Sequence, residues 1–251
     1  MTGNCNGRVI FIWLSLTAND RDVAMKLGLL VAALLVVTLL TAWAAAKKER
    51  PARSGKDWEP TIAAFEKADK AQPPPRGAAL FTGASHISRW KSLAKDFPKY
   101  QVINRGFGGS RISDVLQYAD RIVIPYAPRL VIVQAGGNDI RAGRKPEEVF
   151  AEFKAFVSKV RASLPDTRIA YLSIPSSLRS WPGREPFLRA NALIEEYLKT
   201  QSNVRYIDTW TPMLGEDGQP RAELFVADGL HLSKAGYAVY VRVIEPYLAG
   251  P

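Results

Sequence analysis

The sequence predicts a three-layer α/β/α fold built on a five-stranded parallel sheet. Five short runs of mostly apolar, often β-branched residues are bounded by turn residues and alternate with helical patterns. Near-continuous apolar strands are typical of a parallel sheet that is buried on both faces. Right-handed connections then place the intervening helices on both faces of the sheet. The 251 residues suffice for one large domain of this kind.

The elements follow one another in a regular order. Trp58, Ile62 and Phe65 recur at helical spacing and predict an amphipathic helix over 58–69, which ends before Pro73. Apolar runs between turn residues then predict strands at 78–82, 101–104, 130–134, 168–173 and 204–208. Helical patterns predict helices at 87–95, 112–122, 146–164, 186–199 and 233–248. In such folds the ligand-binding loops follow the carboxyl ends of the strands.

The N-terminal part contains a long apolar segment. Residues 27–46 carry no charge, and twenty helical residues span about 30 Å, the thickness of a bilayer core. With Lys26 before it, this run predicts a signal peptide or a membrane anchor over 25–46. The motif Ala44-Ala45-Ala46 fits a cleavage site, so both readings stay open. Residues 1–24 fit neither a leader nor a domain, and synthesis can start at Met1 or at Met25.

The flanking charges bear on location and on partners. Lys47 and Lys48 favour a cytoplasmic domain by the positive-inside rule, but large domains translocate largely regardless of flanking charge. We therefore expect export, to the periplasm or the extracytoplasmic face of a membrane. The net charge is +10, and its densest cluster lies just after the apolar run, as in a juxtamembrane segment. Residues 47–76 are predicted to be a basic linker with the short helix, followed by the α/β domain at 77–251.

Composition excludes several classes of function. One cysteine, Cys5, rules out an intrachain disulfide framework and a cysteine-ligated metal site. With only two histidines, His86 and His231, a multi-histidine metal centre is not expected. No zinc-finger spacing or RNA-recognition motif is present, so we expect no nucleic-acid partner.

The loops after the strands hold a set of reactive residues. Ser85 follows the first strand at the start of a helix, where its backbone N–H is free. Gly109 lies in a glycine-rich loop after the second strand, and Asn138 follows the third. Asp228 precedes His231 by three residues and can turn back to its imidazole ring.

These residues form a plausible serine-enzyme site. Ser85 would attack an acyl carbonyl, His231 would act as general base, and Asp228 would orient His231. The N–H groups of Ser85 and Gly109 and the amide of Asn138 would stabilise the oxyanion. Each residue also has a structural alternative: Ser85 as a helix cap, Gly109, Asn138 and Asp228 as turn residues, and His231 as a surface histidine.

Three further residues are candidates for substrate binding. His86 lies beside the predicted nucleophile and is expected to line the pocket rather than serve as base. Arg105 and Arg111 can bind an anionic substrate group, with solvated surface charges as the alternative. The loop 176–184, which carries Trp181, is expected to shape the pocket after the fourth strand.

At this point the chain resembles the SGNH (GDSL) hydrolase superfamily. Its four block residues would be Ser85, Gly109, Asn138 and His231, and Asp228 would complete the triad. The likeness runs from about residue 78 to residue 248 and implies a flavodoxin-like sheet and ester hydrolysis without metal or cofactor. One departure is Ala84, where the family usually has Asp. An α/β-hydrolase is disfavoured because the Gly-x-Ser-x-Gly elbow is missing.

The expected function is that of a serine esterase or acylhydrolase that works through an acyl-enzyme. Its substrate can be a small-molecule, lipid or glycan ester. The alternatives are a carbohydrate O-acetylesterase of the cell envelope and a non-catalytic envelope module that binds glycan or lipid. The sequence does not indicate the acyl-chain length or the oligomeric state.

Overall fold

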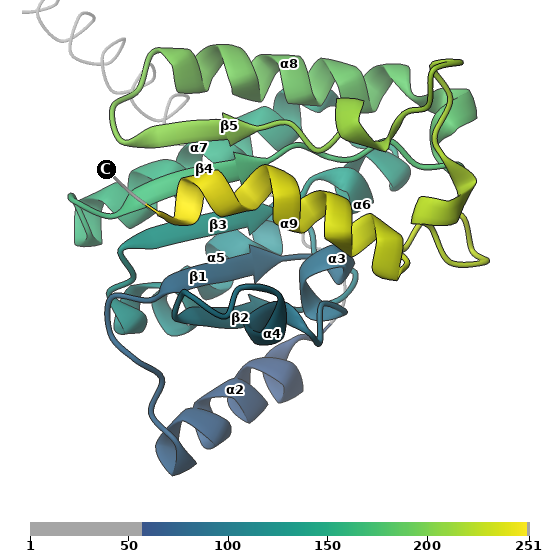
Figure 1. The fold of residues 1–251 in the computed structure, drawn as a ribbon. Coiled ribbons are helices and arrows are strands. Elements are labelled where there is room, and N and C mark those ends of the chain that lie inside the picture. Colours follow the sequence, from purple (N-terminus) through teal and green to yellow (C-terminus); the bar gives the residue numbers. More distant parts are fainter. Residues whose placement is uncertain (1–56, 250–251) are drawn as a thin grey trace, which may run out of the picture. The chain divides into compact units, whose positions relative to one another are not determined.

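The sheet is parallel and five-stranded, as predicted. The computed structural model describes residues 57–249 of the chain. Within them the strands pair in the order β2-β1-β3-β4-β5 (Figure 1). Every neighbouring pair is parallel. The strands are β1 (Ala79–Gly83), β2 (Val102–Gly106), β3 (Leu130–Gln134), β4 (Arg168–Leu172) and β5 (Val204–Ile207).

Helices cover both faces of the sheet and complete the three layers. One face packs against α2 (Glu59–Ala71), α5 (Ile112–Ile122), α7 (Pro146–Ser163) and α8 (Glu185–Lys199). The other face packs against α3 (Ser85–Ser88), α4 (Leu93–Asp96) and α9 (Lys234–Leu248) (Figure 1). A further short helix, α6 (Gly137–Arg141), follows β3. The predicted fold class is confirmed.

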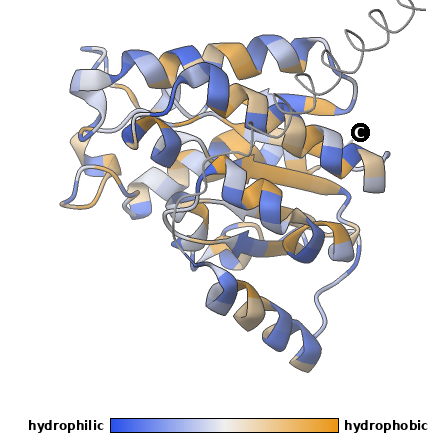
Figure 2. Cartoon of the chain, turned by 180° about the vertical axis from the view of Figure 1, so that it is seen from behind, coloured by the Kyte–Doolittle hydropathy of each residue, from blue (hydrophilic) through white to orange (hydrophobic). Residues whose placement is uncertain are grey.

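Two apolar cores lie on either side of the sheet because successive strand residues point to opposite faces. Leu80 of β1 belongs to the core under α5 and α7, whereas Ala79 and Phe81 belong to the core under α9. All three side chains are fully buried. Figure 2 shows the consequence: the visible strands are largely hydrophobic, while the covering helices alternate hydrophobic and hydrophilic residues.

The helix predicted at 87–95 is instead two short helices, α3 and α4. The amide nitrogen of Asn104 donates hydrogen bonds to the carbonyls of Ile87 (2.7 Å) and Trp90 (3.4 Å). These carbonyls therefore have partners outside the helix, and the buried Trp90 lies between the two helices. Helix α6 was not predicted, because five residues are too few to show a helical period.

The end of β1 is held by backbone contacts directly before Ser85. Gly83 has φ +129°, and a Cβ there would lie 2.0 Å from the carbonyl oxygen of Gln134. The next N–H, of Ala84, donates to that same oxygen at 2.9 Å, and Phe107 N–H donates to the Gly83 carbonyl at 2.9 Å. Neighbouring strands thus fix this turn without the carboxylate that Ala84 replaces.

The membrane prediction concerns residues that the structure does not describe. Across residues 57–249, none of the helices combines the length and apolar character needed to span a bilayer. The predicted extension at 1–24 and the signal peptide or anchor at 25–46 lie outside the described residues, as does most of the basic linker. Those assignments, export included, stay predictions.

Candidate active site

Ser85, His231 and Asp228 form a continuous hydrogen-bonded chain, although 146 residues separate Ser85 from His231. Ser85 Oγ lies 3.0 Å from His231 Nε2, and His231 Nδ1 lies 2.5 Å from Asp228 Oδ2. An ionised carboxylate can only accept hydrogen bonds, so Nδ1 carries the ring proton and Nε2 is left to accept from the serine hydroxyl. This is the arrangement in which a histidine can deprotonate a serine.

Asp228 is fixed by the turn that it begins. Its second oxygen, Oδ1, accepts from the backbone N–H groups of Leu230 and His231, each at 2.9 Å. The hydrogen bond from the His231 ring and these backbone bonds hold the pKa of Asp228 well below its usual range. The carboxylate therefore stays ionised and keeps the imidazole ring in one tautomer and one orientation.

Two backbone N–H groups predicted for the oxyanion hole, those of Ser85 and Gly109, make no hydrogen bond within the described residues. Ser85 is the first residue of α3, so its N–H has no partner within the helix. Gly109 adopts φ +88°, and within the described residues its N–H makes no hydrogen bond. The turn that carries it approaches Ser85 closely, since a Cβ on Gly108 would lie 3.9 Å from Ser85 Cβ.

Asn138 on α6 lines the same cavity as Ser85. Its Nδ2 donates to the Ser110 carbonyl at 2.8 Å, and its Oδ1 accepts from Arg141 Nη2 at 2.8 Å. These two partners define which way the amide faces. One of the two N–H groups on Nδ2 is thereby used, and the second remains for an oxyanion.

His86 lines the cavity, and its ring is engaged by a backbone carbonyl rather than by Ser85. Its Nε2–H donates to the Leu230 carbonyl at 3.0 Å, and its ring centroid lies 6.0 Å from that of His231. Burial lowers the pKa of His86 to about 4, so its ring is neutral near pH 7. A second positive charge beside the His231 imidazolium is thus avoided. A contact between His86 and substrate stays a prediction.

The structure corrects the expectation for Arg105. Its guanidinium group donates to Asp69 and to Tyr126 Oη, and it stacks over the ring of Phe65 at 5.1 Å. Arg105 thus attaches α2 to the sheet and is not free for substrate. Arg111 is the N-cap of α5, and its backbone N–H donates to Asp114 at 2.8 Å. Its predicted contact with substrate stays a prediction.

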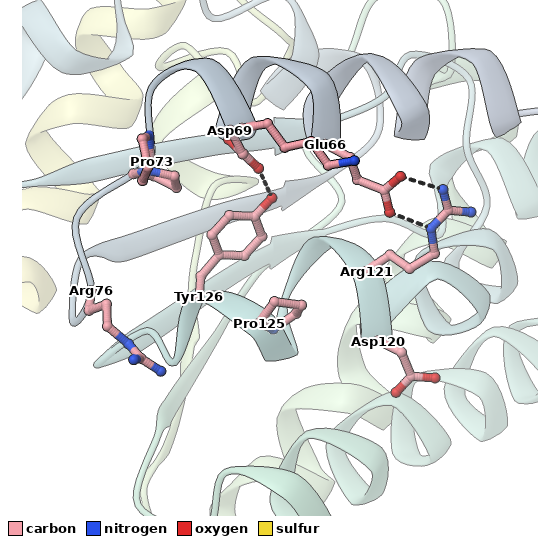
Figure 3. A pocket seen from close by; sticks show the side chains of 10 residues that line it. Glu66, Asp69, Pro73, Arg76, Asp120, Arg121, Pro125 and Tyr126 are labelled. Carbon is pink, nitrogen blue, oxygen red and sulfur yellow. Dashed lines mark hydrogen bonds and ion pairs between the residues drawn. The ribbon is translucent and has the colours of Figure 1, made fainter.

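A larger cavity, of about 710 Å³, lies beside α2 and shares no residue with the cavity at Ser85. It is lined by residues of α2 and of the segments that precede β1 and β3. Figure 3 shows two pairs among its lining residues: Glu66 with Arg121, and Asp69 with Tyr126. Neither Ser85 nor His231 lines it.

The cavity beside Ser85 is much smaller, at about 20 Å³. A cavity needs roughly 10–15 Å³ to hold one water molecule, so there is room for about one methyl-sized group. Its walls include Ala135, Ile174, Pro175 and Leu230. No three His, Cys, Asp or Glu side chains gather to hold a metal ion anywhere in residues 57–249.

A buried acidic pair supports the loops of the site. Asp139, next to Asn138, accepts from Ile112 N–H at 3.2 Å and so joins α6 to the start of α5. Arg144 lies between it and Glu152, at 3.7 Å from Asp139 and 2.5 Å from Glu152. Burial raises the pKa of Asp139 to about 7, and the nearby Glu152 adds to the effect.

We expect Asp139→Asn to change how stability depends on pH. The folded protein keeps the Asp139 proton up to about pH 7, while the unfolded chain releases it near the usual value of 3.8. The contribution of Asp139 to the free energy of unfolding therefore falls as the pH rises across that window. Asn cannot ionise, so the variant should gain stability relative to the wild type between about pH 5 and about pH 8. Urea unfolding of both proteins at both pH values measures this difference, and a difference independent of pH would contradict it.

Sequence reasoning missed several residues that shape the site. Asn104 and Tyr237 hold α3 in place, the latter through a hydrogen bond from its hydroxyl to the His86 carbonyl at 2.9 Å. Asn104 is the last residue of the predicted strand 101–104, next to the glycine-rich loop, and this position was a usable signal. Arg141 lies three residues after Asn138, the spacing of neighbours on a helix face. Arg179 lies in the loop 176–184 that was expected to shape the pocket.

Comparison with protein families agrees with this geometry. The model of the GDSL-like lipase/acylhydrolase family matches residues 76–239, which include all five residues of the predicted triad and oxyanion hole. The chain belongs to this family. As a GDSL-like hydrolase it is expected to cleave esters, and the resemblance read from its four sequence blocks is confirmed.

Solved structures of low sequence identity share the fold of this GDSL-like hydrolase. A GDSL-like lipase from Bacteroides thetaiotaomicron is 21% identical, with a TM-score of 0.65 over 75% of this chain and 97% of that one. A variant of an acetyl xylan esterase from Geobacillus stearothermophilus is 16% identical, with a TM-score of 0.57 over 70% of this chain and 96% of that one. No curated protein sequence matches the chain.

Proposed function

We propose that this GDSL-like hydrolase is a serine esterase with Ser85 as its nucleophile. The observation that carries the proposal is the relay from Ser85 through His231 to Asp228, with contacts of 3.0 and 2.5 Å. Binding alone does not require a serine hydroxyl that is hydrogen-bonded to a histidine oriented by a carboxylate. The intact relay therefore weighs against a non-catalytic role, even though Ala84 departs from the family pattern.

The reaction follows from the positions of these groups. His231 Nε2 takes the Ser85 proton as Oγ attacks the ester carbonyl, and the N–H groups of Ser85, Gly109 and Asn138 receive the oxyanion. His231 then gives the proton to the leaving alcohol, which departs and leaves an acyl-enzyme. A water molecule, deprotonated by His231, hydrolyses the acyl-enzyme and restores Ser85.

The small cavity favours a short acyl group. About 20 Å³ next to Ser85 and Asn138 matches the methyl of an acetyl group better than it matches a longer chain. The second candidate, a carbohydrate O-acetylesterase, fits this size equally well. Support for it comes from the fold shared with the acetyl xylan esterase from Geobacillus stearothermophilus.

Covalent labelling tests the proposal directly. The full chain is treated with a fluorophosphonate, digested, and analysed by mass spectrometry. We expect one adduct, on Ser85, because His231 and Asp228 activate that hydroxyl alone. Prior denaturation, which separates Ser85 from His231, serves as the control and should abolish labelling. An adduct elsewhere, or none on the folded chain, would refute Ser85 as the nucleophile.

An acyl-length series tests the size of the substrate. We expect kcat/KM to fall by at least about tenfold from 4-nitrophenyl acetate to the butyrate and octanoate, because misfit methylenes cost about 1–3 kcal/mol each. Alkaline hydrolysis rates of the same esters provide the chemical reference. Equal or rising values with chain length would show that the cavity opens and would argue against an acetylesterase.

A further inference from the structure

Two arginine side chains flank the predicted catalytic residues. Arg141 lines the cavity that contains Ser85, and its Nη2 donates to Asn138 Oδ1 at 2.8 Å. Arg179 follows β4, and its backbone N–H donates at 3.0 Å to the carbonyl of Gly229, which lies between Asp228 and His231. Each arginine is thus attached to a loop that carries part of the site.

Neither guanidinium group is paired with a carboxylate within residues 57–249. Arg105, Arg121 and Arg144 form ion pairs with acidic side chains, whereas Arg141 has only the neutral Asn138 amide as a partner. No acidic side chain of the described part lies within ion-pair distance of Arg179. Two exposed positive charges at this edge are therefore uncompensated.

The two charges also act on each other. Arg141 is exposed as a residue, but partial desolvation of its guanidinium group in the cavity, followed by repulsion from Arg179, lowers its pKa. The acidic group that opposes this effect is Asp139, and its own pKa is raised to about 7, so it is only partly ionised at neutral pH. Holding two like charges near each other costs free energy that a bound anion would recover.

The same edge exposes apolar surface. Leu178 and Val226 are the large apolar side chains that stand out as exposed in the described part, at 40% and 42%. A Cβ on Gly229 would lie 3.2 Å from Leu178 Cβ, and Val226 N–H donates to the His231 carbonyl at 2.8 Å. Both therefore belong to the loops around His231. Exposed apolar side chains next to a reactive group are typical of a ligand-binding rim.

We propose that Arg141 and Arg179 bind an anionic group, a carboxylate or a phosphate, on the alcohol part of the ester substrate, with Leu178 and Val226 covering its apolar portion. This inference rests on the proposed esterase function, and it specifies the class of ester. The arginines determine specificity and take no part in proton transfer. Because both are exposed, each should contribute about fivefold to selectivity, as an exposed ion pair of about 1 kcal/mol does.

Matched acetate esters provide the test on the full chain. The substrates are 4-acetoxybenzoate, 4-acetoxyphenyl phosphate and the neutral 4-acetoxybenzamide, each corrected for its rate of alkaline hydrolysis. We expect kcat/KM for the better anion to exceed that of the amide by at least about tenfold, mainly through KM. Whichever anion is preferred identifies the source of the charge. Added salt should reduce the preference, because exposed charges are screened.

Single substitutions assign the preference to the arginines. Arg179→Gln and Arg141→Gln should each reduce the ratio of anionic to neutral kcat/KM by about fivefold. Arg242→Gln, at an exposed position on α9, should leave the ratio unchanged. Any loss of activity that Arg141→Gln causes through its contact with Asn138 affects the anionic and the neutral ester alike, so it cancels in the ratio of their kcat/KM values. No preference in the wild type, or an unchanged ratio in both variants, would overturn the inference.

A binding measurement separates this inference from the esterase proposal. The Ser85→Ala chain is titrated with 4-acetoxybenzoate and with 4-acetoxybenzamide, with and without Arg179→Gln. Binding selective for the anion and lost with Arg179 supports the inference even if no ester is hydrolysed. Hydrolysis with no selectivity in rate or binding overturns the inference and leaves the esterase proposal intact. If the protein shows neither hydrolysis nor selective binding, both proposals are refuted.

Discussion

Replacing Ser85 with Ala is expected to lower kcat for 4-nitrophenyl acetate by about 10⁴ to 10⁶, the loss seen when a serine enzyme loses its nucleophile. The attacking oxygen is removed, and His231 has no hydroxyl to deprotonate. The N–H groups of Ser85 and Gly109 and the Asn138 amide remain, so a small residual rate above the uncatalysed one should persist. The change removes one hydroxyl that bonds only to His231, so the fold should be unaffected.

Steady-state hydrolysis measures this loss, and thermal unfolding checks that the variant is folded. Ser88→Ala is the matched control, because it lies on the same helix, α3, and is also partly buried. Its hydroxyl makes only a long contact, 3.5 Å, with the Ser85 carbonyl. Activity in Ser85→Ala within tenfold of that in Ser88→Ala would disprove the assignment of the nucleophile.

Asp228→Asn should lower kcat by about 10⁴, through loss of the correct histidine tautomer. In the wild type, Asp228 Oδ1 accepts hydrogen bonds from the backbone N–H groups of Leu230 and His231 at 2.9 Å. Asn retains an oxygen that can accept the same bonds, so the turn should persist. Its amide nitrogen then faces His231 Nδ1 and donates to it. The ring proton moves to Nε2, and a protonated Nε2 can no longer accept the proton of Ser85.

The matched control for this substitution is Asp217→Asn. Asp217 also begins a turn, with its Oδ1 accepting from Gln219 N–H at 2.9 Å, and it lies on a loop away from Ser85. Its activity should equal that of the wild type. A shift in the ring-nitrogen NMR signals of His231 should accompany the loss in Asp228→Asn. Full activity in that variant would show that His231 is oriented by other groups.

The Ala84 departure is explained by backbone contacts. Gly83 and Ala84 are held by the Gln134 carbonyl and by Phe107 N–H, both at 2.9 Å. The carbonyl of Ala84 also accepts from Ser88 N–H at 3.0 Å as α3 begins. A carboxylate is therefore dispensable for placing Ser85. The backbone contacts therefore favour the esterase proposal over a non-catalytic binding module.

The sheet, and the loops on which the candidate site lies, could be predicted from the order of the amino acids. Strands buried on both faces must be apolar along their whole length, so β1, β3 and β4 stand out in the amino-acid order. Parallel strands end at one edge, so residues that follow them meet there, however far apart they lie in the chain. Ser85, Asn138 and the glycine turn could be assigned to one place on this basis.

The partners of long charged side chains could not be predicted in this way, because they come from distant parts of the chain. Arg105 was a candidate for substrate binding, with a surface charge as the alternative, but its guanidinium group is bound by Asp69, 36 residues away. Arg141 and Arg179 look like ordinary surface residues in the sequence, and only folding brings both to the loops of the site without a carboxylate. A strand is specified by its neighbours in the chain, whereas the environment of a guanidinium group depends on segments that only the folded chain brings together.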